Sequence, residues 1–377
     1  MHIHVDSILP LLENMKAHGA SDLHLKVGLP PYYRINGTLR KIDADMLDGE
    51  TIFRMLLPII PNRRKAQYEQ HGDLDFACQL PDGGDRFRVN AFRCCDQMNA
   101  AIRRVKGEIP TYESLHLPAI YEQLIARTHE GLIIVCGVTG SGKSTTMAAM
   151  LEHINSERGV NIVTIEDPVE YIFKSHKAII SQREIGIDIP DYADALKYIV
   201  RQDPNVIFIG EMRDKNTMLA ALQAAETGHL VFGSLHTADT MQAFARILEF
   251  FPKSEHDFIR GSLSNSLVAI LAQRLLPGCN PEIPRVPATE VLLNGPTTRD
   301  VIRQSRDDDI PELISSAEAE GMHGFTRSLC NLVQDELVFR DTAMKFAPNS
   351  EALASLLRGI KTTAQTMIHR VRASTSG

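Results

Sequence analysis

One eight-residue stretch constrains the fold of this chain more than any other. Residues 137–144 read Gly-Val-Thr-Gly-Ser-Gly-Lys-Ser, which fits the full pattern of a phosphate-binding loop. The stretch follows an apolar run at 132–136 and precedes a helical run at 145–154, the strand–loop–helix setting that the motif requires. We therefore expect an α/β core that binds a nucleotide.

The residue types in this loop match the chemistry of a phosphate site. Glycines let backbone N–H groups converge on the phosphates, and the N-terminus of the following helix adds a favourable dipole. Lys143 is expected to reach the terminal phosphates, and the Ser144 hydroxyl to ligate Mg²⁺. With ATP and Mg²⁺ as the predicted ligands, the predicted binding residues are Gly137, Val138, Thr139, Gly140, Ser141, Gly142, Lys143, Ser144 and Thr145.

Hydrolysis also needs a carboxylate near the metal or the attacking water, and the end of a neighbouring strand is the place for one. The apolar run at 162–165 ends in Glu166, and the run at 206–210 ends in Glu211. We predict that both are catalytic, as is Lys143. Asp167 and Glu170 lie close behind Glu166 and are alternative candidates.

Two histidines and several arginines complete the list of candidates. His229 opens the run at 229–235, and His236 follows it at the carboxyl side, where a γ-phosphate could be sensed. A single histidine usually has a structural role, but we keep both as catalytic candidates. An arginine from a neighbouring subunit often stabilises the transferring phosphoryl group. Arg88 and Arg104 are our candidates to act in trans, from a cluster that also holds Arg86, Arg93 and Arg103, while Arg183, Arg201 and Arg213 lie in the core.

The hydrophobic pattern divides the 377 residues into several parts, since the chain is too long for one compact domain. Alternation at 21–27, an Asn36-Gly37 hairpin signal and a strand pair at 73–80 and 86–93 predict a small α+β domain. Short β-branched runs alternating with helical stretches then predict a parallel sheet with helices on both faces. From Ser254 the spacing indicates helices, with one face formed by Ile259, Leu263, Leu267, Ile270 and Leu271.

We therefore predict an α/β fold in which a PAS-like N-terminal α+β domain (1–106) precedes a RecA-like P-loop ATPase core (117–280). A linker at 107–116 joins the two domains. A mostly helical C-terminal region (281–363) and a disordered tail (364–377) follow.

Composition excludes some functions. No apolar run approaches the ~18 residues of a membrane span, and the N-terminus lacks a signal-peptide pattern, so we expect a cytoplasmic protein with only a peripheral membrane role. The net charge of −7 disfavours nucleic acid as a partner. None of the six cysteines forms a C-x-x-C pair, and we expect adjacent Cys94 and Cys95 to be strand residues that face opposite ways.

Taken together, four motifs resemble those of the secretion ATPase superfamily that powers type IV pili and type II secretion. The loop, the stretch at 164–171, the stretch at 201–214 and the stretch from 225 to 237 are similar to its Walker A, Asp box, Walker B and His box, in that order. Residues 20–31 and 86–92 resemble the N-terminal domain of PilT/PilU-type retraction ATPases in particular. The resemblance covers nearly the whole chain.

The resemblance implies a homohexamer with ATP between the N-terminal domain of one subunit and the core of the next. It implies that Glu166 activates the attacking water and that Glu211, in place of the usual Asp, helps to hold Mg²⁺. The expected partners are an inner-membrane pilus platform protein and, left open, a second retraction ATPase. The expected location is the inner face of the cytoplasmic membrane.

Two departures from the family pattern stand out. The family's retraction-associated segment appears here as Thr-Thr-Arg-Asp-Val-Ile-Arg-Gln at 297–304, with a changed opening that weakens a claim of retraction by this subunit alone. Val138 replaces a usual Pro, at a position that supplies only backbone.

Our leading hypothesis is a hexameric motor ATPase that couples hydrolysis to pilus retraction and twitching motility. The alternative is a pilus assembly or type II secretion ATPase, whose members usually carry a further N-terminal domain and a four-cysteine zinc insertion that this sequence lacks. A nucleotide-binding scaffold without turnover is the non-enzymatic alternative, and the presence of both Glu166 and Glu211 argues against it.

Overall fold

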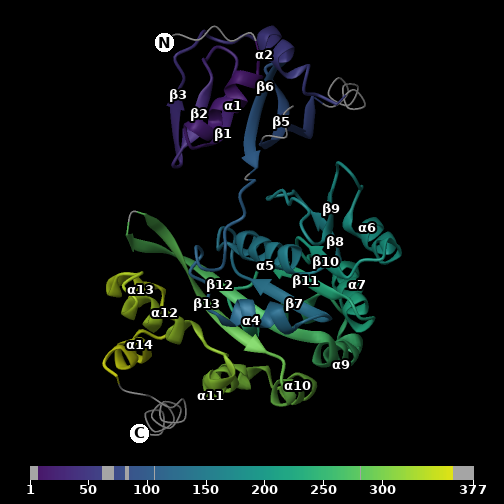
Figure 1. The fold of residues 1–377 in the computed structure, drawn as a ribbon, viewed down its shortest axis with the longest axis vertical. Coiled ribbons are helices and arrows are strands. Elements are labelled where there is room, and N and C mark those ends of the chain that lie inside the picture. The colour runs from purple at the N-terminus through teal and green to yellow at the C-terminus, as the bar shows by residue number, and fades with distance from the viewer. Residues whose placement is uncertain (1–6, 62–71, 81–84, 106, 281, 360–377) are drawn as a thin grey trace. The chain divides into compact units, whose positions relative to one another are not determined.

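The computed structural model describes residues 7–61, 72–80, 85–105, 107–280 and 282–359 and forms two compact units (Figure 1). The first unit comprises Met1–Glu108 with Val169–Phe173, and the second comprises Ile109–Pro168 with Lys174–Gly377. The predicted tail at 364–377 and the turn at 81–84 lie outside the described residues. Within the described ranges, no helix is long and apolar enough to cross a membrane.

The first unit is a six-stranded antiparallel sheet in the order β3-β2-β1-β6-β5-β4. Apolar side chains of two helices, among them Leu12, Met15 and Ile52, pack with Leu23 and Phe87 of the sheet in one core. The elements are α1 (Leu9–Ala17), β1 (Ala20–Leu25), β2 (Tyr32–Ile35), β3 (Thr38–Lys41), α2 (Gly49–Leu56), β4 (Asp73–Gln79), β5 (Arg86–Cys94) and β6 (Gln97–Val105).

The turns of this unit confirm one sequence prediction and overturn another. Asn36 and Gly37 both have positive φ (49° and 80°) between β2 and β3, as a tight hairpin requires. Cys95, in contrast, does not lie in a strand beside Cys94. It has a φ of 50° in the turn from β5 to β6, and both thiols are exposed. The prediction that the two cysteines alternate across a strand was therefore wrong, because the strand ends between them.

The second unit is built on a seven-stranded sheet in the order β13-β12-β7-β11-β10-β8-β9, parallel except for β13. The strands are β7 (Gly131–Cys136), β8 (Asn161–Glu166), β9 (Ile179–Glu184), β10 (Val206–Ile209), β11 (Leu230–Leu235), β12 (Leu267–Asn280) and β13 (Ile283–Leu293). The four apolar runs predicted as strands are thus confirmed as β7, β8, β10 and β11. Every residue of β7, β10 and β11 is buried, as expected for strands covered on both faces.

Helices follow the strands and cover the sheet (Figure 1). They are α4 (Ile120–Arg127), α5 (Lys143–Glu157), α6 (Tyr192–Ile199), α7 (Lys215–Glu226), α8 (Thr240–Glu249), α9 (His256–Ser266), α10 (Pro296–Arg303), α11 (Ile310–Ser316), α12 (Phe325–Gln334), α13 (Arg340–Phe346) and α14 (Ser350–Leu357). These elements confirm the predicted fold class, an α/β chain with an α+β first unit, a P-loop core and a helical C-terminal part.

The helix predicted through Leu267, Ile270 and Leu271 is wrong beyond Ser266. Helix α9 ends there, and residues 267–280 form β12, which pairs with β7 on one side and with β13 on the other. A strand that is buried on both faces has a continuous apolar run, and such a run cannot be distinguished from a buried helix by its periodicity.

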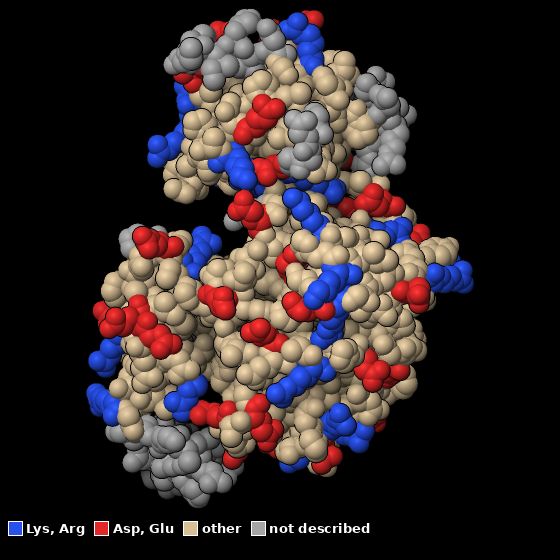
Figure 2. Space-filling view, viewed as in Figure 1, with Lys and Arg blue, Asp and Glu red and all other residues tan. Residues whose placement is uncertain are grey.

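The charges on the surface are mixed. On the face shown in Figure 2, Lys and Arg side chains are interspersed with Asp and Glu rather than gathered into one basic stripe. A stripe of that kind is the usual electrostatic footprint of a nucleic-acid-binding protein.

Candidate functional site

The phosphate loop leaves the carboxyl end of β7 and enters α5. Gly137, Gly140 and Gly142 have φ values of 159°, 80° and 91°. A Cβ on Gly137 would come within 2.3 Å of Ser141 Oγ, and one on Gly142 within 2.7 Å of Gln273 Nε2. The loop is therefore compact enough that its turns require glycine, which leaves backbone N–H groups as the lining.

The charge of the loop is provided by Lys143, the first residue of α5. Its side chain is held across the loop, since Nζ donates to the carbonyl oxygens of Gly137 (2.8 Å) and Val138 (3.3 Å). Lys143 is only 8% exposed, and the buried hydroxyl of Ser141 has no hydrogen-bond partner among the described residues. Ser144 and Thr145 follow in the first turn of α5. A buried ammonium, a hydroxyl available for hydrogen bonding and a helix N-terminus form a donor set that fits phosphate oxygens.

Glu166 is the last residue of β8, in the same sheet as the loop. It is 6% exposed, and its Oε1 accepts hydrogen bonds from Thr164 Oγ1 (2.6 Å) and Gln182 Nε2 (3.1 Å). Two neutral donors thus fix the orientation of this carboxylate. Asp167 follows it, joined to Pro168 by a cis peptide bond.

Glu211 lies just after β10, the strand next to β8, and its surroundings are charged. Its Oε2 is 2.7 Å from Arg213 Nη2 and 3.4 Å from His236 Nε2. Burial by itself would raise the pKa of the Glu211 carboxyl. The hydrogen bond from Arg213 and the positive charges of His236, Arg213 and Lys143 outweigh this effect and hold the pKa below its usual value.

His236 connects this carboxylate to the loop. It follows β11, and its Nδ1 lies 3.4 Å from Thr139 Oγ1 while Nε2 faces Glu211. Arg213 extends the cluster in the other direction, because its Nη1 is 3.4 Å from Asp167 Oδ2. The carboxyl ends of β7, β8, β10 and β11 therefore bring together Lys143, Glu166, Glu211 and His236, as the sequence predicted they should meet.

The structure does not bring His229 to this cluster. His229 precedes β11 and so lies at the amino edge of the sheet, where its Nδ1 contacts Ala224 O (2.9 Å) and Thr227 Oγ1 (3.2 Å). These contacts hold the ring against the end of α7. Its catalytic assignment stays a prediction that the geometry within one subunit does not support.

The two candidate trans arginines belong to the first unit. Arg88 lies on β5 opposite Arg103 of β6. Arg104 on β6 forms a shielded ion pair with Asp85. The Arg88 side chain has no ion-pair or hydrogen-bond partner among the described residues, whereas Arg104 is already neutralised within its own subunit.

A cavity of about 230 Å³ adjoins the phosphate loop. The loop residues Val138 and Thr139 form one side of it, and Leu275 of β12 and Phe346 of α13 line it as well. Arg274 also lines the cavity. Its Nη1 donates to Phe346 O (3.3 Å), and its guanidinium stacks on the ring of Phe325 at 4.1 Å. An apolar cavity next to a phosphate loop is suited to hold a nucleoside base.

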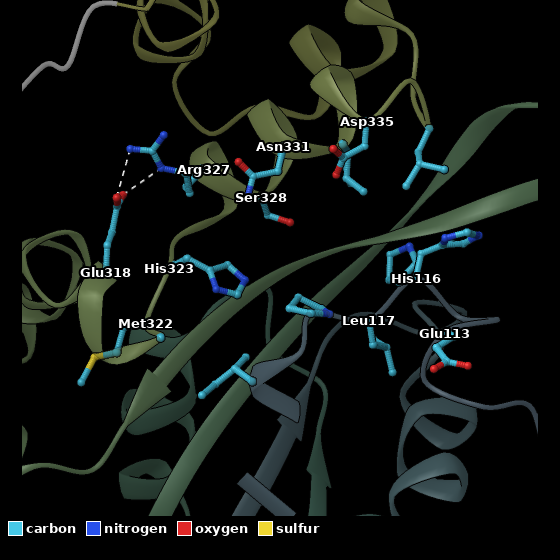
Figure 3. A pocket seen from close by; sticks show the side chains of 16 residues that line it. Glu113, His116, Leu117, Glu318, Met322, His323, Arg327, Ser328, Asn331 and Asp335 are labelled. Atoms are coloured by element: carbon cyan, nitrogen blue, oxygen red, sulfur yellow. Dashed lines mark hydrogen bonds and ion pairs between the residues drawn. The ribbon is translucent and has the colours of Figure 1, made fainter. Parts of the chain in front are cut away.

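A larger cavity of about 610 Å³ lies elsewhere in the second unit (Figure 3). It is lined by Glu113, His116, Leu117 and Pro118 ahead of α4 and by the C-terminal segment around α12, and no residue of the phosphate loop is among its lining residues. Its arginine, Arg327, is bound through two hydrogen bonds to Glu318, and His323 faces Thr289 Oγ1 at 2.8 Å. Arg327 is therefore already engaged, and burial lowers the pKa of His323, which disfavours its charged form. This cavity is a poorer phosphate site than the loop.

Sequence reasoning missed several residues that hold the site together. Arg213 was one of many arginines with no feature to select it. Gln182 comes from β9, which was not predicted. Gln273 interrupts the apolar run of β12 near the end of the parallel segment, and this single polar residue in a buried strand was the available signal.

Comparisons with known proteins agree with this geometry. A family model described as type II/IV secretion system protein matches residues 3–334. A twitching motility protein of Neisseria gonorrhoeae is 37% identical over 348 residues, which cover 92% of each chain. The type IV pilus retraction ATPase PilT of Pseudomonas aeruginosa is 36% identical over 90% of this chain and 98% of its own length. A crystal structure of the pilus retraction motor PilT with bound ADP is similar with a TM-score of 0.84 and 37% identity, and the match covers 92% of this chain and 99% of that one.

The charged surroundings of Glu211 generate a prediction about pH. Because its pKa is lowered in the folded state, the interaction with Arg213 stabilises the protein above the pKa of the unfolded carboxyl and is lost as the pH falls through the lowered value. An Arg213→Gln substitution should lower the free energy of unfolding at pH 7, and this deficit should shrink as the pH falls below about 4.5. Urea unfolding of both proteins across this range measures the effect. A deficit that stays constant with pH would show that Arg213 acts by packing alone.

Proposed function

From the membership of this chain in the type II/IV secretion system protein family, we propose that it is a motor ATPase that couples ATP hydrolysis to type IV pilus retraction. The observation that carries the proposal is the meeting of Lys143, Glu166, Glu211 and His236 at one edge of the core sheet. Relatives named for twitching motility and pilus retraction align over at least nine-tenths of this chain, which supports retraction as the task of the motor.

ATP is the substrate in this proposal. The loop N–H groups and Lys143 hold the phosphates, and the adjoining cavity at Leu275 and Phe346 takes the base. Thr164 and Gln182 orient Glu166 through one of its oxygens, and the Glu166 carboxylate is the proposed acceptor of a proton from the attacking water. Ser144 and Glu211 would hold Mg²⁺, which neutralises charge on the β- and γ-phosphates when it is bound.

His236 is proposed to report the state of the γ-phosphate. It stands between Thr139 of the loop and the Glu211 carboxylate, within 3.4 Å of each. A change in charge at the phosphates would alter both contacts at once, and β11 would carry the change into the sheet.

The assembly expected for this motor is a homohexamer docked on an inner-membrane pilus platform protein at the cytoplasmic face of the membrane. A second retraction ATPase can act beside it. These partners are proposed from the family and from relatives named for twitching motility and pilus retraction.

Deletion of the gene tests the direction of the motor. We expect surplus pili that no longer retract, and loss of twitching on agar. Complementation by the wild-type chain should restore both. Bald cells would instead support the alternative, an assembly ATPase, and a secretion defect with normal pili would support a type II secretion ATPase.

Glu166→Gln tests hydrolysis. The substitution keeps the shape of the side chain and an oxygen for Thr164 but removes the base. Turnover at saturating ATP should fall by at least ~10²-fold while nucleotide affinity stays near the wild-type value. Asp194→Asn, at an exposed acid on α6, is the control and should leave turnover unchanged. If Glu166→Gln lowered affinity and spared turnover, Glu166 would be a binding residue and the catalytic role would pass to Glu211.

A mixing experiment tests the arginines in trans. Lys143→Ala subunits keep their arginines, and Arg88→Ala/Arg104→Ala subunits keep the loop, so mixed interfaces should regain activity that neither variant has. A cation supplied in trans can contribute ~10³-fold in rate. We expect the mixture to release phosphate at a rate well above the sum of the rates of the two variants measured separately.

The control for this mixture is Arg40→Ala, which alters an exposed arginine of β3 and should be active by itself. Because Arg104 pairs with Asp85, Arg88→Ala alone is mixed in parallel. If hexamers form and exchange subunits but the mixture stays inactive, these arginines do not complete the site.

A further inference from the structure

The side chain of Gln273, on the neighbouring strand β12, makes one hydrogen bond to the phosphate loop and one to the helix that follows it. Its Nε2 donates to the carbonyl oxygen of Ser141 (2.7 Å), and its Oε1 accepts from Thr146 Oγ1 (2.8 Å). Ser141 lies in the loop and Thr146 in α5 just behind it, so one amide joins the loop to the helix that follows. The side chain is 2% exposed, which excludes competition by bulk water.

The fit around this amide is close. A Cβ on Gly142 would lie 2.7 Å from Gln273 Nε2, and a Cβ on Gly137 would lie 2.5 Å from the Gln273 carbonyl oxygen. Backbone pairing of β12 with β7 reaches Ala272 and Cys136, the residues directly before Gln273 and Gly137. The strand pairing therefore delivers Gln273 to the loop, and two of the three loop glycines with positive φ are required because Gln273 occupies the adjacent space.

We propose that Gln273 is a positioning residue for nucleotide binding, which holds the loop in the conformation that turns its backbone N–H groups toward the phosphates. The proposal rests on the proposed nucleotide site, whose cavity Gln273 also lines, and adds to it a residue that acts on nucleotide binding through the loop. An amide is required because it donates to Ser141 and accepts from Thr146 at the same time. A carboxylate can only accept, and a hydrocarbon of similar size can do neither.

A core-filling role for Gln273 predicts something different. In that case a side chain of similar volume would restore both stability and binding, and the protonation state of the replacement would not matter. The positioning role requires a donor aimed at the Ser141 carbonyl, because loss of that donor leaves a buried carbonyl without its partner.

Gln273→Glu separates the two roles through pH. When the introduced carboxyl is protonated, it has one O–H donor and one oxygen acceptor, as the amide does, and when it is ionised it has no donor. The groups that neighbouring elements bring near the introduced carboxyl are Cys136 of β7, Thr289 of β13 and Lys143 of α5. Of these, Lys143 is positively charged. Burial raises the pKa of Cys136 to about 12, so desolvation at this position is strong and should raise the pKa of an introduced acid as well.

The experiment measures the dissociation constant of ADP by titration of full-length protein between pH 5.5 and pH 8. For Gln273→Glu, we expect ADP binding at least ~10-fold weaker than wild type at pH 8, with the ratio of the two constants falling toward one as the pH decreases. For Gln273→Leu, binding should be weakened by a similar factor at every pH. Gln334→Glu, at an exposed glutamine of α12, is the matched control and should bind like wild type throughout.

A companion variant and a melting curve keep the test decisive. Thr146→Val removes one partner of the amide and should weaken binding less than Gln273→Leu, and its effect should not add when the two are combined. Thermal melting without nucleotide reports folding independently. Wild-type affinity in Gln273→Glu, or an affinity ratio that does not change with pH, overturns the inference. A wild-type chain that binds no ADP overturns the proposed function and the inference together.

Discussion

The hydrogen-bonded pairing of β7 with β11 on one side and β12 on the other is the constraint on which the site depends. Every residue of β7 is buried, and its last residue, Cys136, is aligned with Leu235 of β11 and Ala272 of β12. Strands β7 and β11 end at this row, whereas β12 continues to Asn280. Because the three strands are parallel, the residue that follows the row on each of them is delivered to a common place. Gly137 begins the loop there, and His236 faces Glu211 there. Gln273 donates a hydrogen bond to the loop from β12. The site is thus a consequence of strand register, and its side chains need no long connecting segments to reach one another.

Sequence alone could predict the parts of this arrangement that depend on local pattern. The loop was recognisable because glycine, lysine and serine occur at fixed spacing between a strand and a helix. The position of Glu166, Glu211 and His236 at the same edge of the sheet as the loop was predictable, because each follows an apolar run and parallel strands end at the same edge. His229 was a candidate as well, yet it precedes its strand rather than follows it, and the structure accordingly places it at the opposite edge. The direction of the chain through the strand decided which of the two histidines reaches the loop.

What sequence could not predict depends on which surfaces become buried and on which elements become neighbours. Leu267, Ile270 and Leu271 were assigned to a helix because a strand covered on both faces loses the alternation that identifies strands. Because of this error Gln273 was missed as a residue of the site, since it reaches the loop only if β12 is a strand next to β7. Arg213 has no distinguishing neighbours along the chain, and its role becomes visible only when Glu211 and Asp167 are found on either side of its guanidinium. Pairings between distant residues carry no signature in a single sequence.

The surroundings of the two carboxylates favour a division of labour between them. Glu211 faces Arg213, His236 and the charge of Lys143, which together hold its pKa down, so it stays ionised, and a permanent negative charge is what a divalent cation requires of a ligand. The contacts of Glu166 include two neutral donors, from Thr164 and Gln182, and both of them bind the same oxygen. Environments that differ in this way are the usual means by which two chemically identical groups take different roles in one site. On this argument, the base should be sought at Glu166 and the metal at Glu211, and Arg213 and Gln182, rather than the carboxylates themselves, would determine which is which.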